Sequence, residues 1–332
     1  MTPSLILADA PSAVATLQRA SKLVAPVLDG VVDRLSPELR AAVRHHLGGG
    51  GKFVRAGLVL LSAAAAGASE DSVVFGAAAI ELVHNFSLLH DDIIDGDTER
   101  RHRPTVWAKF GVGQALIAGD ALMVLALQLL LDEPTPARTS AAARLASATQ
   151  AMIAGQAEDM ALEHRSSLSV EACLEMEAGK TGALLSCAAA LGAILSGAPG
   201  QIVEALSEYG RHLGIAFQAI DDLLGVWGEP AVTGKPVGSD LCRHKKSLPV
   251  AIALSSPQVS ERLRSLLTGE LAGRDVETAA RMLEDFGVRE ATMAIGEAHL
   301  QAALAALDRT VLPAGPRAEL AAVARYVTAR DR

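Results

Sequence analysis

Three long stretches of this chain contain no proline, and they constrain its fold more than any other feature. They cover residues 38–103, 137–198 and 258–312. Proline breaks helices because it lacks a backbone N–H and its ring clashes with the preceding turn. Apolar residues make up 50% of the chain and aromatic residues only 3%, so the core must be built from Ala, Leu, Val and Ile. Such a composition favours helix over sheet, and the sequence predicts an all-α protein.

Glycine and proline clusters indicate where these helices end. We expect breaks at residues 48–51, 104, 133–136, 197–200, 228–238 and 312–316. No internal repeat and no long linker marks a boundary between domains. We therefore expect a single domain over residues 1–332, an antiparallel bundle of about ten or more helices around a central cavity.

Charge and cysteine content narrow the class of protein. The formal net charge of −8 argues against a nucleic-acid partner held on a broad basic face. Cys173, Cys187 and Cys242 have neither metal-ligand spacing nor a disulfide pattern, so we expect a cytoplasmic protein. Residues 1–10 lack the features of a signal peptide. The apolar stretch 183–198 is too short for a membrane span, and we expect a buried helix there.

The first acidic cluster is Asp91-Asp92-Ile93-Ile94-Asp95, followed by Arg100-Arg101-His102-Arg103. On a helix over residues 81–95, His84, Asp91 and Asp95 share one face, because offsets of 7 and 11 residues return to the same side. Carboxylates in apolar surroundings need metal, cations or water to compensate their charge. The cluster therefore predicts a metal site with an anion site beside it. The alternative is a solvated acidic loop at a helix end.

The second acidic cluster lies about 130 residues further on, at Gln218-Ala219-Ile220-Asp221-Asp222. Gln218, Asp221, Asp222 and Gly225 fall on one helix face. A charged loop of about 20 residues follows, and loops of this length often act as lids. A solvated, lysine-rich surface loop is the alternative.

A run of glycines precedes a predicted helix at residues 48–51, with Lys52 and Arg55 directly after it. Backbone amides and two cations at a helix start suit an anion. The run is not a Walker A loop, because the residue types around the lysine do not fit that motif. A flexible hinge is the alternative.

Together, these residues resemble those of the trans-isoprenyl diphosphate synthases, the polyprenyl synthetase family, over about residues 50–249. The resemblance implies an isoprenoid synthase fold and head-to-tail prenyl transfer from an allylic diphosphate to isopentenyl diphosphate. It also implies about three Mg²⁺ ions per active site and a homodimer, to which the apolar stretch 114–131 would contribute.

The resemblance assigns residues to each part of such a site. For isopentenyl diphosphate it implies Lys52, Arg55, His84 and Arg101. Metal ligands would be Asp91 and Asp95, with Asp92 beside them, and Asp221 for the third ion. For the allylic diphosphate it implies Arg100, Lys180, Thr181, Gln218, Lys235 and Lys245, with Gln156 and Asp159 lining the cavity.

The chain departs from the family pattern at four positions close to these residues. Phe53 stands where the family usually has arginine, and Ala56 where it has proline. His102 replaces a glycine after the arginine pair, and Gly225 replaces the last aspartate of the second motif. We expect a weaker isopentenyl site from the first two changes, and an active enzyme if the third metal depends mainly on Asp221.

Product length is read from the residues before the first motif. In the family, a bulky residue five positions before the first aspartate limits chain growth, and Phe86 has that place, followed by the small Ser87. This favours a C20 product, geranylgeranyl diphosphate. The alternatives are a farnesyl or longer-chain diphosphate synthase, a class I terpene cyclase and a non-catalytic partner subunit. A cyclase needs no second diphosphate site, so the transferase is favoured over the cyclase by Lys52, Arg55, His84 and Arg101.

Overall fold

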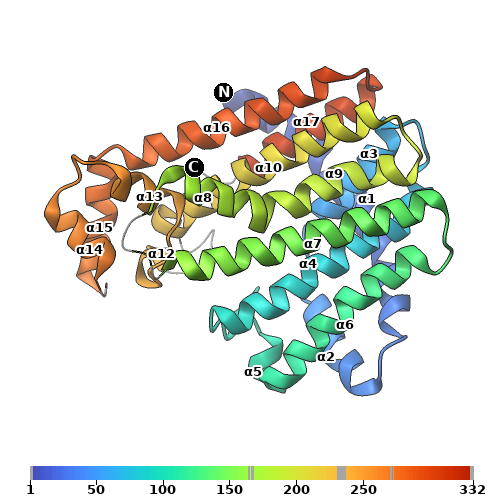
Figure 1. Ribbon diagram of the computed structural model, residues 1–332, viewed down its shortest axis with the longest axis horizontal. Helices are drawn as coiled ribbons and strands as arrows, with labels where there is room; N and C mark the ends of the chain where they lie inside the picture. The colour runs from blue at the N-terminus through green and yellow to red at the C-terminus, as the bar shows by residue number, and fades with distance from the viewer. Residues whose placement is uncertain are drawn as a thin grey trace. The chain divides into compact units, whose positions relative to one another are not determined.

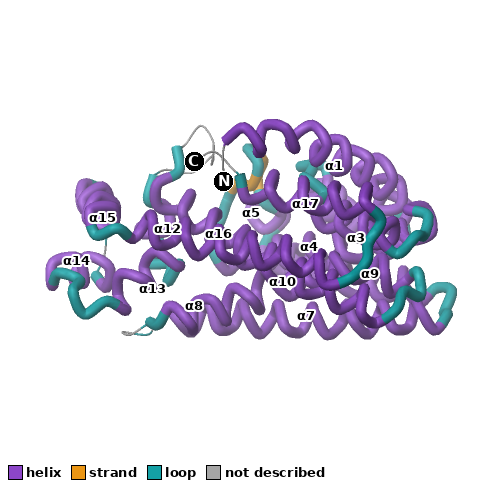
Figure 2. The backbone as a smooth tube through the Cα atoms, turned by 90° about the horizontal axis from the view of Figure 1, so that it is seen from above, coloured by secondary structure: helices purple, strands orange, loops and turns teal. Residues whose placement is uncertain are grey.

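The structure is a computed structural model that describes residues 3–163, 165, 168–229, 237–269, 271 and 273–329, with the backbone alone for residues 3–9. The described part is almost entirely helical, and its one sheet is a two-stranded hairpin (Figure 2). This confirms the predicted all-α class. The chain divides into two compact units, and several helices contribute residues to both.

The first unit comprises Met1–Thr149, Ser186–Glu208 and Ala306–Val323. Its elements are α1 (Pro3–Val32), α2 (Pro37–Leu47), α3 (Val54–Ala65), η1 (Glu70–Val73), α4 (Val74–Ile94), β1 (Glu99–Arg100), β2 (Arg103–Pro104), α5 (Val106–Phe110), α6 (Val112–Leu131) and η3 (Leu307–Arg309). Within it, α4 packs along α6, and α3 lies against both α1 and α4 (Figure 1).

The second unit comprises Gln150–Leu185, Tyr209–Ala305 and Ala324–Arg332. Its elements are α8 (Val170–Glu177), the π-helix η2 (Ala178–Gly182), α12 (Ser239–Cys242), α13 (Leu248–Ser255), α14 (Glu261–Thr268), α15 (Arg274–Asp285) and most of α16 (Val288–Ala306). The helices with residues in both units are α7 (Pro136–Glu163), α9 (Ala183–Leu195), α10 (Gly200–Trp227) and α17 (Ala314–Thr328).

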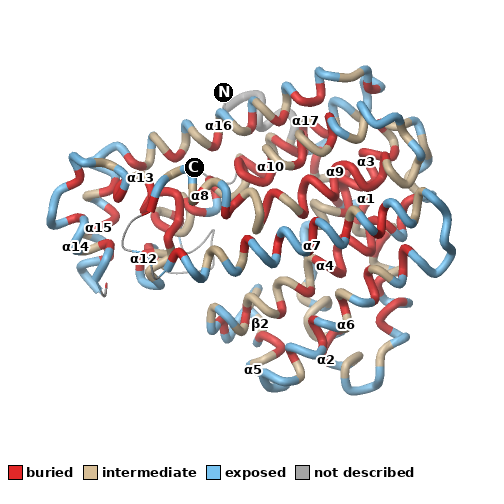
Figure 3. The backbone as a smooth tube through the Cα atoms, viewed as in Figure 1, coloured by how far each residue is buried: buried red, intermediate tan, exposed pale blue. Residues whose placement is uncertain are grey.

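Small and branched apolar side chains form the core of the first unit, as the composition predicts. Leu58, Leu61, Ile80, Leu82 and Leu129 are all at most 1% exposed. Buried residues run along α3 and α9 (Figure 3). Such close packing of alanine-rich helices leaves few polar groups inside, so each buried charge calls for a physical explanation.

Helix boundaries fall where glycine and proline predict them. The glycine run at 48–51 separates α2 from α3, and residues 133–136 separate α6 from α7. Ser36 caps α2 by accepting a hydrogen bond from the Leu39 backbone N–H at 3.5 Å, and Pro37 occupies the first turn. Helix α1 differs from this pattern, because it contains both Pro11 and Pro26.

Among the described residues, three helical stretches are long and apolar enough to cross a membrane by length and composition alone: Glu70–Ile94, Val112–Leu131 and Val170–Leu195. In the first and third, 61% and 67% of the most apolar window is buried, whereas in Val112–Leu131, which is α6, only 44% is. The apolar side chains of the first and third stretches are therefore used mainly in packing inside the protein. Helix α6 keeps an exposed apolar face.

Candidate active site

The first acidic motif occupies the C-terminal end of α4. Asp91 and Asp92 lie in the last turn, and Asp95 is the C-cap residue, whose backbone N–H donates to the Asp91 carbonyl at 2.8 Å. Asp91 and Asp95 are partly buried and Asp92 is 1% exposed. Because residues four apart share a helix face, Asp91 and Asp95 lie on the same side of α4, as the spacing predicts.

Asp92 is paired with the first arginine of the following hairpin. The Arg100 Nε donates to Asp92 Oδ1 at 2.7 Å, and the Asp92 Oδ2 is buried without a hydrogen-bond partner among the described residues. Burial raises the pKa of the Asp92 carboxyl to about 6, although Arg100 opposes the shift. Since this bond uses only Nε, the terminal nitrogens of Arg100 remain able to hold an anion.

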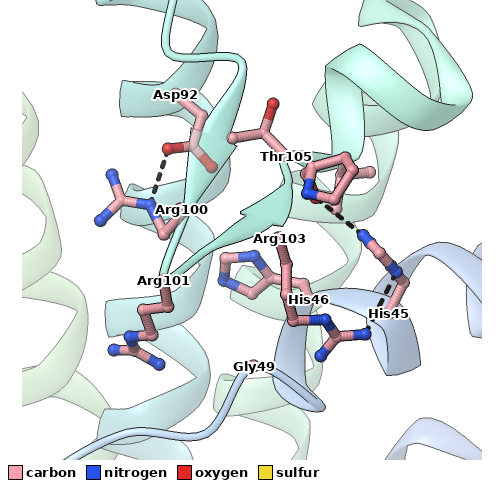
Figure 4. A pocket seen from close by; sticks show the side chains of 10 residues that line it. His45, His46, Gly49, Asp92, Arg100, Arg101, Arg103 and Thr105 are labelled. Carbon is pink, nitrogen blue, oxygen red and sulfur yellow. Dashed lines mark hydrogen bonds and ion pairs between the residues drawn. The ribbon is translucent and has the colours of Figure 1, made fainter. Parts of the chain in front are cut away.

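A cationic pocket lies beside this pair (Figure 4). It is lined by His45, His46, Gly49, Asp92, Arg100, Arg101, Arg103, Pro104, Thr105 and Val106. The hairpin formed by β1 and β2 supplies its arginines, and the glycine run after α2 lies opposite them (Figure 4). A pocket with three guanidinium groups and one buried carboxylate suits a multiply charged anion.

The tip of this hairpin has a left-handed backbone. Arg101 has φ = 53° and His102 has φ = 59°, and both side chains are exposed. Glycine adopts such angles at no steric cost, whereas other residues do so rarely. This conformation explains why a glycine is usual at position 102, and shows that His102 is accommodated without loss of the hairpin.

Two histidines beside the pocket are held in the neutral form. Burial, helped by Arg100 and Arg101, lowers the pKa of His46 to about 3. Burial also lowers the pKa of His84 well below its usual value, and Arg55 and Arg101 add to this effect. Because the positive charge here resides on arginines, a neutral His84 can donate or accept one hydrogen bond beside them.

Two further cations, Lys52 and Arg55, follow the glycine run. Arg55 lies in the first turn of α3, partly buried, and its Nε has no hydrogen-bond partner among the described residues. The charge of the buried Glu81 acts on Arg55, and Glu81 accepts a hydrogen bond from the Ala56 N–H at 2.9 Å. Phe53 precedes α3 with φ = 52°, a strained angle for a bulky side chain, and Lys52 is exposed.

In the second unit, the predicted Lys180 and Asp159 form an ion pair. The Lys180 Nζ donates to Asp159 Oδ2 at 2.5 Å. Lys180 lies in the π-helix η2, a rare element that occurs often at functional sites. Gly155 allows the backbone of α7 to approach that of η2 closely, because a Cβ at this position would overlap the backbone of Lys180.

A chain of hydrogen bonds connects η2 to the second acidic motif. The Thr181 Oγ1 donates to Gln218 Oε1 at 2.9 Å, and the Gln218 Nε2 donates to Asp222 Oδ1 at 2.9 Å. The Leu248 N–H donates to the other oxygen of Asp222 at 2.7 Å. Asp222 is 5% exposed, and burial raises its pKa to about 6. Asp221 beside it is exposed. The structure thus brings Thr181, Gln218 and the second motif together.

Position 225, where the family pattern has an aspartate, is a glycine that lies against the carboxylate of Asp240. A Cβ placed on Gly225 would overlap the carboxylate of Asp240, which lies against the glycine. Asp240 also accepts, through its backbone carbonyl, a hydrogen bond from the Lys245 N–H at 3.0 Å. The space beside residue 225 is therefore occupied by a carboxylate from another part of the chain.

The remaining predicted residues lie as follows. Lys235 falls outside the described residues, as do residues 230–236 of the predicted lid loop, whereas α12 and the residues around it are described. Lys245 and Gln156 are partly buried. Phe86 is 6% exposed, and its ring meets the His90 ring edge to face at 4.9 Å. The Ser87 Oγ donates to the His84 carbonyl at 2.9 Å.

The aspartate carboxylates of the two motifs are ligands of the type that suits Mg²⁺ when oxygens of a substrate complete the coordination shell of the ion. In the described part of the chain, no group of three or more His, Cys, Asp or Glu side chains could hold a metal ion. Mg²⁺ prefers oxygen ligands, keeps several waters and is usually bound by one or two carboxylates together with phosphate oxygens. Asp91 and Asp95 supply carboxylates of this kind at the first motif, and Asp221 supplies one at the second.

Sequence reasoning missed several residues of these environments, and His46 and Glu177 are two of them. His46 lines the cationic pocket, and Glu177 is buried against Asp222. The sequence carried a signal for Glu177, because it stands at the helical spacing of the buried residues Cys173 and Met176 on α8. A charged residue at an apolar position of a helix indicates a specific buried partner.

Comparisons with known proteins identify the family of this chain. The family model described as Polyprenyl synthetase matches residues 36–284. A (2E,6E)-farnesyl diphosphate synthase of Mycobacterium tuberculosis is 43% identical over 329 residues, covering 94% of this chain and 92% of that protein. A geranylgeranyl diphosphate synthase of the same organism is 41% identical, covering 90% and 89%. The crystal structure of a polyprenyl synthetase from Streptomyces coelicolor A3(2) has a TM-score of 0.90 and 45% identity, covering 94% and 98%.

Proposed function

This chain belongs to the polyprenyl synthetase family and is a prenyltransferase, and we propose that it extends an allylic diphosphate head to tail with isopentenyl diphosphate, with Mg²⁺ as its metal and geranylgeranyl diphosphate as its product. The family model covers residues of both compact units, so both acidic motifs lie inside the matched region.

One observation carries the proposal. Beside the first acidic motif, burial lowers the pKa of His84 well below its usual value, and the charges of Arg55, Arg101 and Arg100 lower it further. The pocket beside this motif is lined by Arg100, Arg101 and Arg103, and Asp92 supplies the one carboxylate in its lining. An anion of high charge density would offset the mutual repulsion of these arginines, and a diphosphate is such an anion. We assign Lys52, Arg55, His84 and Arg101 to the diphosphate of isopentenyl diphosphate.

The allylic diphosphate is assigned to the carboxylates and the remaining cations. Asp91, Asp95 and Asp221 would hold about three Mg²⁺ ions, and Mg²⁺ when bound stabilises negative charge on phosphate oxygens. Arg100, Lys180, Lys235 and Lys245 would supply further positive charge, and Thr181 and Gln218 would hold Lys180 in place through their hydrogen bond. Lys180 is now paired with Asp159, which fixes the direction of its ammonium group.

The chain's own residues then act by positioning and by electrostatics. As the allylic C1–O bond breaks, both electrons leave with the diphosphate, and Arg100 and Lys180 stabilise the added charge. His84 and Arg101 hold isopentenyl diphosphate so that its double bond attacks C1. The carbocation that forms loses a proton, and the released diphosphate takes it up. Asp91, Asp95 and Asp221 serve as ligands and not as acids or bases.

The C20 product rests on Phe86. Relatives named for C15 and for C20 products match this chain at 43% and 41% identity, so the residues near the first motif must decide. Phe86 lies five positions before Asp91, and its ring packs against the His90 ring in a T-shaped arrangement. The His90 Nε2 lies 3.1 Å from the Leu116 carbonyl of α6, where Gly119 leaves room for the ring. A large side chain fixed in this way would limit growth, whereas Ser87 would not.

We further propose a homodimer in the cytoplasm. Exposed apolar side chains line α6, among them Leu116, Ile117 and Val124, at 41%, 56% and 50% exposure. A second copy of this chain would cover such a face. The localisation rests on three dispersed thiols, all unpaired with one another.

Chromatography of the products tests this function. Purified protein is incubated with Mg²⁺, labelled isopentenyl diphosphate and a C5, C10 or C15 allylic diphosphate in turn. We expect label in a C20 diphosphate. Products formed from the allylic substrate alone would instead identify a terpene cyclase. No product with any primer would identify a non-catalytic subunit.

A further inference from the structure

His45 and Arg103 line the cationic pocket, and the proposed reaction assigns neither of them a role (Figure 4). The His45 Nε2 lies 2.8 Å from the Pro104 carbonyl, which can only accept a hydrogen bond. The His45 Nδ1 lies 3.4 Å from Arg103 Nη2 and 3.3 Å from Lys109 Nζ, and both of these groups can only donate. The partners therefore assign the imidazole proton to Nε2 and make Nδ1 the acceptor.

This acceptor is the main polar partner of the Arg103 side chain. Arg103 is partly buried and forms no ion pair within the described part of the chain. Its guanidinium group lies at the C-terminal end of α2, where the last carbonyl groups of a helix favour a positive charge. The ring nitrogen of His45 and the end of α2 together fix the position of Arg103.

Arg103 and Arg101 lie beside opposite ends of the glycine run. A Cβ placed on Gly48 would lie 3.1 Å from the Arg103 Nη1, and one on Gly49 would lie 3.9 Å from the same atom. A Cβ placed on Gly51 would lie 3.6 Å from the Arg101 Nη1. The absence of side chains on these glycines thus allows the hairpin to approach the backbone of the run closely.

The hairpin and the glycine run carry two cations of the proposed isopentenyl diphosphate site. Arg103 pairs with Arg100 across the hairpin, so that Arg101 and His102 form the turn between them. Lys52 directly follows the glycine run. Because Arg103 is two residues from Arg101 and lies beside the run that leads to Lys52, its position limits how far these two cations can separate.

We propose that Arg103 is a positioning residue for isopentenyl diphosphate. Held by His45, it keeps the hairpin in place against the glycine run, so that Arg101 and Lys52 face one diphosphate group. Arg103 acts through these two cations and does not itself contact the substrate. The inference rests on the proposed function in assigning Lys52 and Arg101 to isopentenyl diphosphate.

Steady-state kinetics with each substrate varied in turn tests this role. For Arg103→Met we expect the KM for isopentenyl diphosphate to rise at least about fivefold, because a hydrogen bond of a charged group that supports the site is lost. The KM for the allylic diphosphate should stay within about twofold of the wild-type value. A general loss of stability would not separate the two substrates, so an equal rise for both would overturn the proposal.

Lys109→Met is the matched control. It removes a cation from the same nitrogen of His45 and changes the net charge equally, but Lys109 lies on α5 and not on the hairpin. We expect both KM values to stay at the wild-type level in Lys109→Met. The same KM for isopentenyl diphosphate in Arg103→Met and Lys109→Met would overturn the proposal.

A change at His45 separates positioning from direct binding. His45→Phe keeps a ring beside Phe110 and removes both nitrogen atoms. If Arg103 acts through His45, this variant also raises the KM for isopentenyl diphosphate, and the double variant with Arg103→Met loses little beyond either single one. A wild-type KM in His45→Phe, or fully additive losses in the double variant, would overturn the proposal.

Hydrogen exchange tests the contact without substrate or turnover. The backbone N–H groups of Gly48, Gly49 and Gly50 donate to carbonyls of α2 at 2.9, 3.0 and 3.0 Å, so their exchange reports on the order of the run. We expect Arg103→Met to speed the exchange of a peptide that covers residues 48–52 at least about threefold, and Lys109→Met to leave it unchanged. Equal exchange in wild type and both variants would overturn the proposal.

The two kinds of measurement keep the proposals distinguishable. A wild-type protein that forms no prenyl product with any primer would refute the proposed function, while hydrogen exchange would still decide whether Arg103 holds the glycine run. If His45→Phe does not fold, the comparison of Arg103→Met with Lys109→Met gives the answer.

Discussion

The Arg100 Nε lies 2.7 Å from Oδ1 of Asp92, and this bond joins the β1–β2 hairpin to the end of the acidic helix. The Asp92 side chain is 1% exposed and that of Arg100 is 30% exposed. Asp92 thus aligns Arg100 beside Asp91, while the arginine keeps access to solvent and to an anion.

Breaking this pair from the arginine side should destabilise the protein. Arg100→Met leaves the Asp92 carboxylate buried without its cation, and we expect a loss of about 2 kcal/mol in the free energy of unfolding. Urea denaturation measures it. Asp92→Asn combined with Arg100→Met should recover part of the loss. Arg103→Met is the control in the same hairpin, and an equal effect of both single arginine variants would refute the special role of the pair.

Shortening the side chain at position 86 should lengthen the product. Phe86→Ala removes the ring that packs against His90, and we expect chains beyond C20 in the chromatogram. Circular dichroism must show that the variant is folded, because loss of a buried phenylalanine costs about 3–5 kcal/mol. Phe75→Ala is the control, since Phe75 is 47% exposed. An unchanged product distribution in folded Phe86→Ala would exclude Phe86 as the limit to growth.

Charge on the exposed face of α6 should dissociate the dimer. Ile117 and Val124 are seven positions apart and therefore share a helix face. We expect wild type to sediment as a dimer and Ile117→Glu combined with Val124→Glu to sediment as a monomer. Val311→Glu alters an apolar residue that is 92% exposed at another place and should leave the dimer intact. A dimer that persists with both charges on α6 would place the interface elsewhere.

The neutral state of His46 predicts a dependence of stability on pH. Its pKa in the folded protein is about 3, below the usual 6.5, so below pH 6.5 the unfolded chain binds more protons at this residue. The contribution of His46 to stability is therefore complete above pH 6.5 and is lost as the pH falls towards 3. We expect wild type to lose more unfolding free energy than His46→Gln between pH 8 and pH 5. The exposed His102→Gln should follow wild type, and parallel curves for all three would contradict the assignment.

The sequence was sufficient for the fold class, because proline spacing and alanine content act locally on helix formation. The boundaries at 48–51, 133–136 and 197–200 are confirmed by the structure. The position of the first acidic motif on one helix is confirmed as well, since residues four and seven apart share a helix face whatever packs against it.

Contacts between distant parts of the chain could not be predicted in this way. Glu177 and Asp222 are 45 positions apart, and only the packing of α8 and α10 brings them together. Likewise, the glycine at position 225 showed that a carboxylate was missing, but not that Asp240 occupies the space. Buried pairs of like charge depend on tertiary structure, and local sequence patterns do not report them. The roles of the individual site residues stay predictions.

The central claim is that Asp91 and Asp221 act on one allylic diphosphate. The most direct measurement is the rate of Mg²⁺-dependent product formation in Asp91→Ala, Asp221→Ala and the double variant, with Glu99→Gln as a control for an exposed acidic residue near the first motif. We predict that each single variant loses nearly all activity and that the double variant loses little more, because groups that act as a unit are not additive. Turnover near the wild-type value in either single variant would contradict the claim.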